Sequence, residues 1–169
     1  MQLNTLHDLL YAEINDLYDA ERRISELLPK MQGAATHPDL KQAFANHLDE
    51  TLEQRRRLDE VYAKLGKSYD GETCEATQGL VKEAQAVIDA SGDPAVRDAA
   101  LISAAQRVEH YEIAGYGTAR TLARQLELLD VADLLQKTLD EEYEADGKLD
   151  TLAEGGLFSS GINAEAAHQ

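Results

Sequence analysis

The middle of the chain carries two glutamates and a tyrosine at helical spacing. Glu109 and Glu112 are three residues apart and Tyr116 follows four residues later, so their side chains are neighbours on a helix surface. Glu112 falls in line with Ala105 and Ala119, which mark an apolar stripe. A carboxylate in that stripe faces other helices instead of water, and burying it without a partner is costly. Its partners must therefore come from elsewhere in the sequence.

Acidic and polar side chains also interrupt the apolar stripes of three other predicted helices. Glu142 and Asp146 lie one turn apart beside the stripe of the helix predicted over residues 131–154. The predicted metal ligands, each on or beside such a stripe, are Asp16, Glu50, Gln54, Glu109, Glu112, Glu142 and Asp146. The alternative or supporting ligands are Glu13, Glu21 and His47. The three acidic residues of the first helix compete for one place.

Most of these residues share one depth of the predicted bundle, and Glu13 lies deeper. At about 1.5 Å per residue, Glu112 and Glu142 lie within about one turn of the same level in their hairpin. Asp16 and Glu21 bracket the level of Glu50 in the other hairpin. One layer of the bundle therefore gathers the oxygen ligands of all four helices.

Crowded carboxylates repel one another unless they are protonated, hydrogen-bonded or bound to cations. Two divalent ions would neutralise four carboxylates, so the layer predicts a dimetal site. An oxygen-rich shell favours Mn, Mg or Ca and holds Fe less tightly. His47, one turn before Glu50, could supply a nitrogen ligand.

The elements that must position these residues are long amphipathic helices. Apolar residues recur at three- and four-residue spacing, and Asp93-Pro94 is a strong helix start. The predicted helices cover residues 5–32, 38–65, 75–90, 94–128 and 131–154, the third being short. Two helical hairpins joined by a long crossover that contains the short helix make an all-α, ferritin-like four-helix bundle. We expect one domain over residues 1–154 and a mobile tail over 155–169, because the tail is small and polar.

The amino-acid composition argues against some classes of binding partner and some cellular compartments. The 169 residues include 32 acidic and 16 basic side chains, a formal charge of −16, which argues against binding nucleic acid or anionic lipid. No apolar run approaches the roughly 20 residues of a membrane span, and the N-terminus lacks the pattern of a signal peptide. Cys74 is the single cysteine and fits a reducing compartment. We therefore expect a cytoplasmic protein.

Several segments resemble the YciE/YciF-like family, and more closely its YciF branch. They are Asp16-Leu-Tyr-Asp-Ala-Glu21, His47-Leu-Asp-Glu50-Thr with Gln54, Arg97-Asp-Ala-Ala-Leu-Ile, Gln106-Arg-Val-Glu-His-Tyr-Glu112-Ile-Ala-Gly-Tyr-Gly117, and Thr138-Leu-Asp-Glu-Glu142 with Asp146. The resemblance extends over nearly the whole chain before the tail. It implies a ferritin-like bundle, a homodimer and a bacterial stress-associated protein.

The Glu109-x-x-Glu112 pair also resembles the third-helix motif of rubrerythrins, which reduce peroxide at a di-iron site. By this resemblance Asp16, Glu50, Glu112 and Glu142 take the four carboxylate places, with Glu50 and Glu142 as bridges. The sequence departs from the Glu-x-x-His pairs usual in dimetal bundles. Oxygen ligands or nothing fill the usual histidine places.

Three functions follow from this pattern. The first is a dimetal-carboxylate oxidoreductase in which two Fe or Mn ions react with peroxide or O₂, as a peroxidase, a catalase-like enzyme or a ferroxidase. Tyr116 would be its redox-active residue, and a reductase would need an external electron donor. The second is a structural or partner-binding stress protein whose buried polar network holds no metal. The third is iron storage in a hollow shell, but no fifth-helix signal follows Glu154, which favours the dimer.

Overall fold

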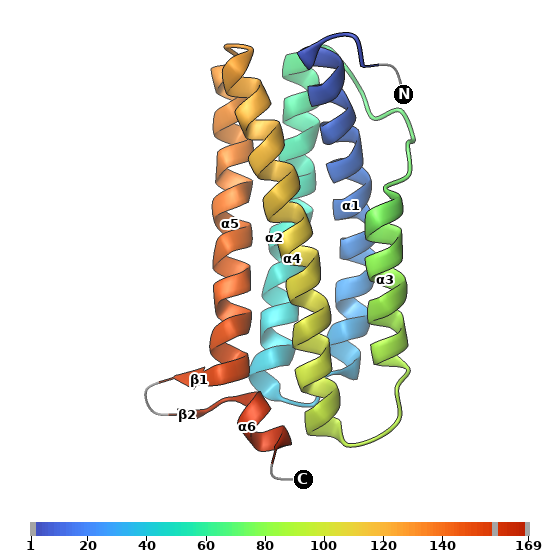
Figure 1. Cartoon of the computed structure of the whole chain (residues 1–169), viewed down its shortest axis with the longest axis vertical. Coiled ribbons are helices and arrows are strands. Elements are labelled where there is room, and N and C mark those ends of the chain that lie inside the picture. The colour runs from blue at the N-terminus through green and yellow to red at the C-terminus, as the bar shows by residue number, and fades with distance from the viewer. Residues whose placement is uncertain (1–2, 157–158, 168–169) are drawn as a thin grey trace.

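Four long helices run side by side along the long axis of the molecule (Figure 1). The computed structural model describes residues 3–156 and 159–167. The long helices are α1 (Leu6–Ala34), α2 (Pro38–Leu65), α4 (Pro94–Gln125) and α5 (Leu129–Glu154). The shorter α3 (Glu75–Ile88) lies in the crossover and packs against α1 and α4. The predicted all-α bundle of two hairpins is confirmed. Within the described residues no helix has the length and apolarity that crossing a bilayer requires.

The helix ends form where the local sequence supplies capping groups. The side chain of Asp93 accepts hydrogen bonds from the backbone N–H groups of Ala95 and Val96 at 2.8 and 3.1 Å, and Pro94 opens α4 as predicted. Gly66 ends α2 with a φ of 63°, a left-handed conformation that glycine adopts without strain. These caps set the lengths of the helices that carry the polar layer.

The apolar core divides into two halves along the bundle. One half contains Leu27, Phe44 and Leu101, and the other contains Leu58 and Leu135, together with further buried residues of each helix. Between these two halves lie buried His47 of α2, Glu109 and Glu112 of α4, and Glu142 of α5. The polar layer predicted from the stripes therefore lies between two apolar halves of the core.

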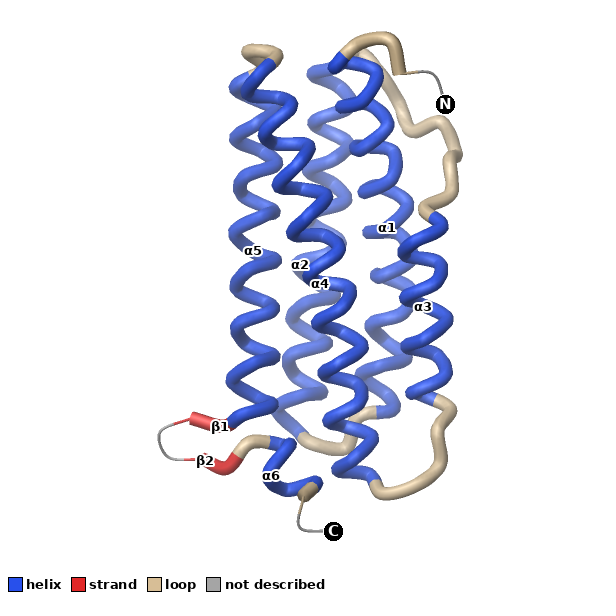
Figure 2. The backbone as a smooth tube through the Cα atoms, viewed as in Figure 1, coloured by secondary structure: helices blue, strands red, loops and turns tan. Residues whose placement is uncertain are grey.

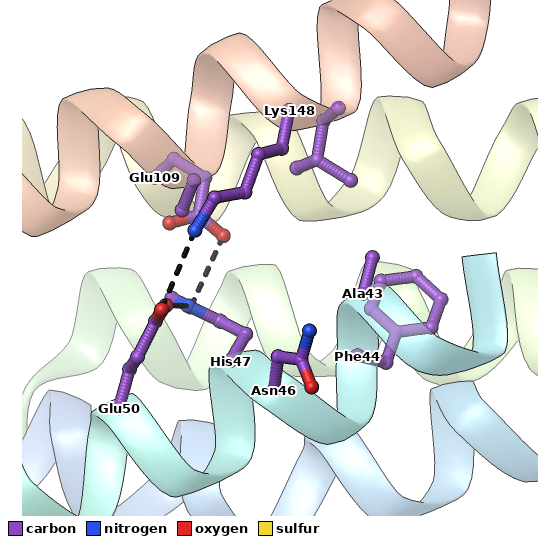
Figure 3. Close-up of a pocket in the computed structure, with 9 residues that line it drawn as sticks. Ala43, Phe44, Asn46, His47, Glu50, Glu109 and Lys148 are labelled. Carbon is purple, nitrogen blue, oxygen red and sulfur yellow. Dashed lines mark hydrogen bonds and ion pairs between the residues drawn. The ribbon is translucent and has the colours of Figure 1, made fainter. Parts of the chain in front are cut away.

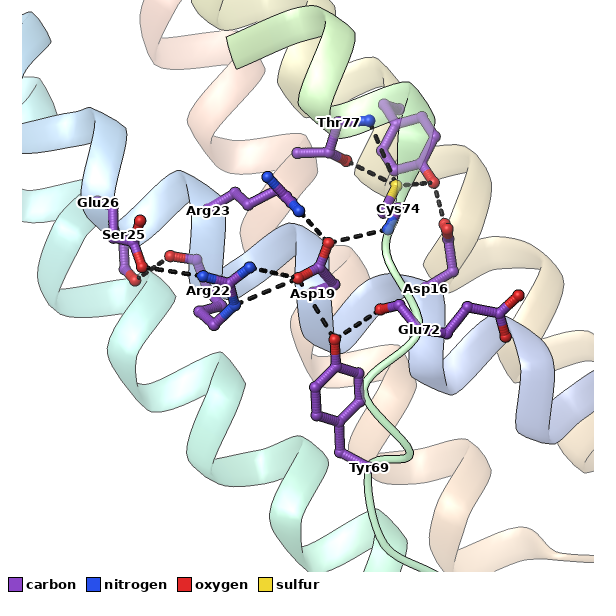
Figure 4. A network of polar contacts seen from close by, with 11 residues as sticks. Asp16, Asp19, Arg22, Arg23, Ser25, Glu26, Tyr69, Glu72, Cys74 and Thr77 are labelled. Atoms are coloured by element: carbon purple, nitrogen blue, oxygen red, sulfur yellow. Dashed lines mark hydrogen bonds and ion pairs between the residues drawn. The ribbon is translucent and has the colours of Figure 1, made fainter.

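Buried Asp19 fastens the crossover to α1 (Figure 4). Its carboxylate accepts hydrogen bonds from Arg22 and Arg23, both at 2.6 Å. It also accepts from the backbone N–H of Cys74 at 2.8 Å and from the hydroxyl of Tyr69 at 3.4 Å. Because hydrogen bonds to a charged group are strong, this network holds the start of α3 against the bundle.

The residues after α5 form a short antiparallel pair and a small helix (Figure 2). Strand β1 (Gly155–Gly156) pairs with β2 (Ser159–Ser160), and α6 (Ile162–Ala166) packs against α4 and α5. Ile162 is buried in the half of the core that contains Leu27, Phe44 and Leu101. The mobility predicted for residues 155–169 stays a prediction, and residues 157–158 and 168–169 lie outside the described part of the chain.

The backbone approaches closely at Gly161, which precedes α6. A Cβ at this position would lie 2.2 Å from the carbonyl oxygen of Ala153 and 2.3 Å from the carbonyl carbon of Glu154. We expect Gly161→Ala to lower the free energy of unfolding by about 1–3 kcal/mol, measured as a lower melting temperature. Gly79→Ala is the control, because a Cβ there meets nothing within 4 Å. Equal melting temperatures for Gly161→Ala and the wild type would contradict this contact.

Candidate metal centre

The centre of the polar layer is a group of four buried side chains from three helices. They are His47 of α2, Glu109 and Glu112 of α4, and Glu142 of α5. Each offers one ligand atom, and these atoms lie within 4.8 Å of one another. No member is more than 7 % exposed. This is the spacing of side chains that share one or two cations.

Glu21 of α1 adds a buried carboxylate from the fourth helix beside this group. Its side chain is 0 % exposed, and the hydroxyl of Tyr116 donates a hydrogen bond to its Oε1. Its negative charge acts on both Glu112 and Glu142. All four helices of the bundle thus contribute to one cluster of four carboxylates and one imidazole.

The cluster contains more acceptors than the surrounding residues can satisfy. Within the described residues, one carboxylate oxygen of each glutamate is buried and has no hydrogen-bond partner: Glu21 Oε2, Glu109 Oε2, Glu112 Oε1 and Glu142 Oε2. Buried polar atoms without partners are rare in native proteins because each costs free energy. Such oxygens, on glutamates gathered beside an imidazole, fit divalent cations, which bind carboxylate oxygen and imidazole nitrogen.

Burial changes the protonation of these carboxyl groups. Burial raises the pKa of Glu21 to about 8, although the hydrogen bond from Tyr116 opposes this rise. Burial also raises the pKa of Glu112 well above its usual range, and the charge of Glu21 adds to the effect. The pKa of Glu142 rises for the same reason, with Glu112 as the main neighbouring charge. Without a cation, burial and mutual repulsion therefore favour the protonated forms of these carboxyl groups.

His47 lies between two carboxylates. Its Nε2 is 3.3 Å from Oε1 of Glu109, and its Nδ1 is 3.5 Å from Oε2 of Glu50. Burial lowers the pKa of His47, but the neighbouring carboxylates of Glu109 and Glu50 outweigh it, so the pKa is raised overall. In the absence of metal the imidazole can carry a positive charge that offsets part of the cluster.

Two predicted ligands lie at the edge of the cluster. Gln54 is fully buried, and its Nε2 donates to Oε1 of Glu142 at 2.5 Å, so it orients that carboxylate. Glu50 keeps 33 % of its side chain exposed and also pairs with Lys148, whose Nζ is 3.4 Å from Oε1. Glu50 is thus placed at the entrance of the cluster and not at its centre.

Three predicted residues lie apart from the cluster. Asp16 accepts a hydrogen bond from the hydroxyl of Tyr111, which itself contacts Cys74 of the crossover. Asp146 pairs with exposed His110, with 3.5 Å between Oδ2 and Nε2. Glu13 lines a shallow surface pocket together with Asp16. Among the competing acidic residues of α1, only Glu21 reaches the cluster.

Tyr116, the predicted redox-active residue, lies directly beside the cluster. It is fully buried, and its only described hydroxyl contact is the bond to Glu21. Burial raises its pKa well above the usual value, and the charges of Glu21 and Glu112 add to this effect. The phenol therefore stays protonated and keeps its hydrogen bond to Glu21.

Comparison with known proteins agrees with this architecture. A family model described as "Domain of unknown function (DUF892)" matches residues 5–167. The chain belongs to the DUF892 family. The Protein YciF of Escherichia coli K12 is 44% identical over 154 residues, which cover 90% of this chain and 93% of YciF. The resemblance to the YciF branch, predicted from the motifs, is confirmed.

Solved structures of other proteins show the same bundle. The Escherichia coli stress protein YciF matches with a TM-score of 0.86 at 43% identity, over 89% of this chain and 95% of that chain. YcfI of Rhodopseudomonas palustris, for which its description suggests a structural role, matches with a TM-score of 0.87 at 44% identity, over 90% and 97%. A Xanthomonas campestris protein shares the fold at 19% identity and a TM-score of 0.73, over 97% and 95%.

Proposed function

We propose that the cluster holds two divalent metal ions, Fe or Mn, and that this DUF892 protein is a stress-associated oxidoreductase acting on peroxide or O₂. The observation that carries the proposal is the set of four buried carboxylate oxygens without partners, supplied by three of the four helices beside a histidine from the remaining one. The stress role comes from the similarity to a protein described as a stress protein. A bacterial cytoplasmic setting and a homodimer are part of the proposal, and light scattering tests the dimer.

The residues of the chain have separable roles in such a site. When bound, Fe or Mn supplies a change of oxidation state that no side chain here provides. The carboxylates of Glu112 and Glu142 would bind the cations and neutralise their charge. The amide of Gln54 orients Glu142 by a hydrogen bond. Tyr116 keeps a proton beside Glu21. The two apolar halves exclude bulk water and thereby strengthen every charge interaction within the site.

A second candidate is a structural or partner-binding protein without metal. The hydrogen bonds from Gln54 to Glu142 and from Tyr116 to Glu21 favour it, because they satisfy part of the cluster internally. The raised pKa values of Glu21 and Glu112 favour it too, since protons can replace cations as neutralising charges. In this case the cluster would specify how the four helices pack.

Metal content separates the two candidates. After anaerobic loading with Fe(II) or Mn(II) and desalting, we expect about two ions per chain by elemental analysis. Chelation should then lower the melting temperature, because a ligand bound only by the folded state stabilises it. Less than one ion per chain, with an unchanged melting temperature on chelation, would support the metal-free network. Peroxide consumption with and without an external reductant then distinguishes peroxidase from catalase-like activity.

A further inference from the structure

A narrow cavity between α2 and α5 ends at the cluster (Figure 3). The volume of the cavity that is open to a water-sized molecule is about 30 Å³. By a comparable measure, a single water molecule needs roughly 10–15 Å³. Its wall is mainly apolar, with Phe44, Ala145 and Leu149 among its lining residues, and it reaches the cluster members His47 and Glu109. The cavity therefore fits a molecule of about two heavy atoms next to two ligands.

The cavity continues outward into a surface groove along the same two helices. The groove has a volume of about 550 Å³ and shares Ala43, Asn46 and Lys148 with the cavity. Gly147 and Ala43 are the small residues of its lining. A continuous path therefore leads from solvent, past these shared residues, to His47 and Glu109.

The ion pair between Glu50 and Lys148 lies in the wall of the cavity, beside His47 and Glu109 (Figure 3). It joins α2 to α5, and the two side chains are 33 % and 53 % exposed. An exposed pair of this kind contributes only about 0–1 kcal/mol, so it opens easily. The ammonium of Lys148 opposes the entry of free cations, and the apolar wall disfavours any hydrated ion.

We propose that this cavity is the entrance by which a small uncharged oxidant, of the size of O₂ or H₂O₂, reaches the centre, and that the Glu50–Lys148 pair is its cover. The inference rests on the proposed function and adds the path and the size limit of the oxidant. Larger organic hydroperoxides are too bulky for the cavity. The route is testable separately from metal binding.

The first test uses the metal-free protein and dissolved xenon, an uncharged apolar probe that enters dry cavities. We expect xenon to shift the methyl NMR signals of Ala145 and Leu149 in the wild type. Ala43→Leu should abolish these shifts, because its larger side chain fills the path. Ala45→Leu is the matched control, since Ala45 lies on the same helix but lines neither space. Absent shifts in the wild type, or undiminished shifts in Ala43→Leu, would overturn the route.

The second test measures how fast nitric oxide, a neutral diatomic, binds the ferrous protein in stopped flow. We expect Ala43→Leu to slow binding about tenfold and Lys148→Ala to speed it about threefold, as for removal of a gate. Lys64→Ala is the control, because it breaks another α2–α5 ion pair, with Asp130 at 3.2 Å. Unchanged rates in both variants, with iron retained, would refute the entrance. If no variant binds iron, the proposed function fails and the xenon result alone decides the route.

Discussion

Glu142→Gln is expected to reduce the metal content of the protein to near zero while leaving the bundle folded. Glu142 is 0 % exposed, and one of its oxygens has no partner among the described residues. An amide removes the negative charge and one of the two acceptor oxygens, so metal affinity should fall by at least about 100-fold. The hydrogen bond from Gln54 can persist, because the amide oxygen still accepts it. Elemental analysis after anaerobic loading measures the effect.

The same variant should stabilise the metal-free protein. A neutral amide needs no proton or cation, so its burial avoids the cost that a crowded carboxylate imposes. We expect a gain of about 1–3 kcal/mol in the free energy of unfolding at pH 8, seen as a higher melting temperature. Glu144→Gln, an exposed position on the same helix, should change neither quantity. Full metal content in Glu142→Gln would remove this residue from the ligand set.

Periodicity and capping signals were enough to predict the architecture. The helix starts at Pro38, Glu75 and Pro94 agree with the structure, because proline and capping residues act locally. The prediction that the ligands share one depth of the bundle also used only local helix geometry. Because the rise per residue is constant, Glu112 and Glu142 could be placed in one layer, and the structure gathers both in the same cluster.

The choice among the acidic residues of α1 could not be made from the sequence. This helix packs against α3 as well as α2 and α4. Residues on two different sides of the helix are therefore buried. Asp16 faces the crossover side, where Tyr111 donates to it, whereas Glu21 faces the bundle axis beside Tyr116. A hydrophobic stripe shows that a residue is buried but not which neighbour it faces.

The places of His47 and Glu50 depend on tertiary packing in the same way. The two residues are one turn apart, so either could point inward from its position on α2. In the structure His47 enters the cluster, and Glu50 turns toward Lys148 at the surface. The one signal in the sequence was the polarity of this turn, with a histidine three residues before a glutamate. It identifies the helix face but not the order of the ligands.

The metal-free protein is expected to lose stability as the pH rises from about 5 to about 8. Glu21 has a pKa raised from 4.5 to about 8 in the folded protein, and Glu112 and Glu142 are raised as well. The folded state therefore binds more protons than the unfolded chain in this range, and stability falls as pH increases. His47 acts in the same direction, because its pKa is also raised on folding. The contribution is fully present below the unfolded pKa values and is lost as the pH passes the folded ones.

Metal should reverse this dependence. Binding requires deprotonated carboxylates and a neutral imidazole, so it releases protons and becomes tighter as pH rises. At 100 times the dissociation constant, a bound ligand adds about 2.7 kcal/mol of stability. The difference in melting temperature between loaded and chelated protein should therefore widen from pH 5 to pH 8. Glu21→Gln should flatten the slope of the chelated protein, because one of the raised groups is gone. A chelated wild type whose melting temperature stays constant over this range would show that the cluster is not neutralised by protons, and a gap that does not widen would argue against metal competing with them.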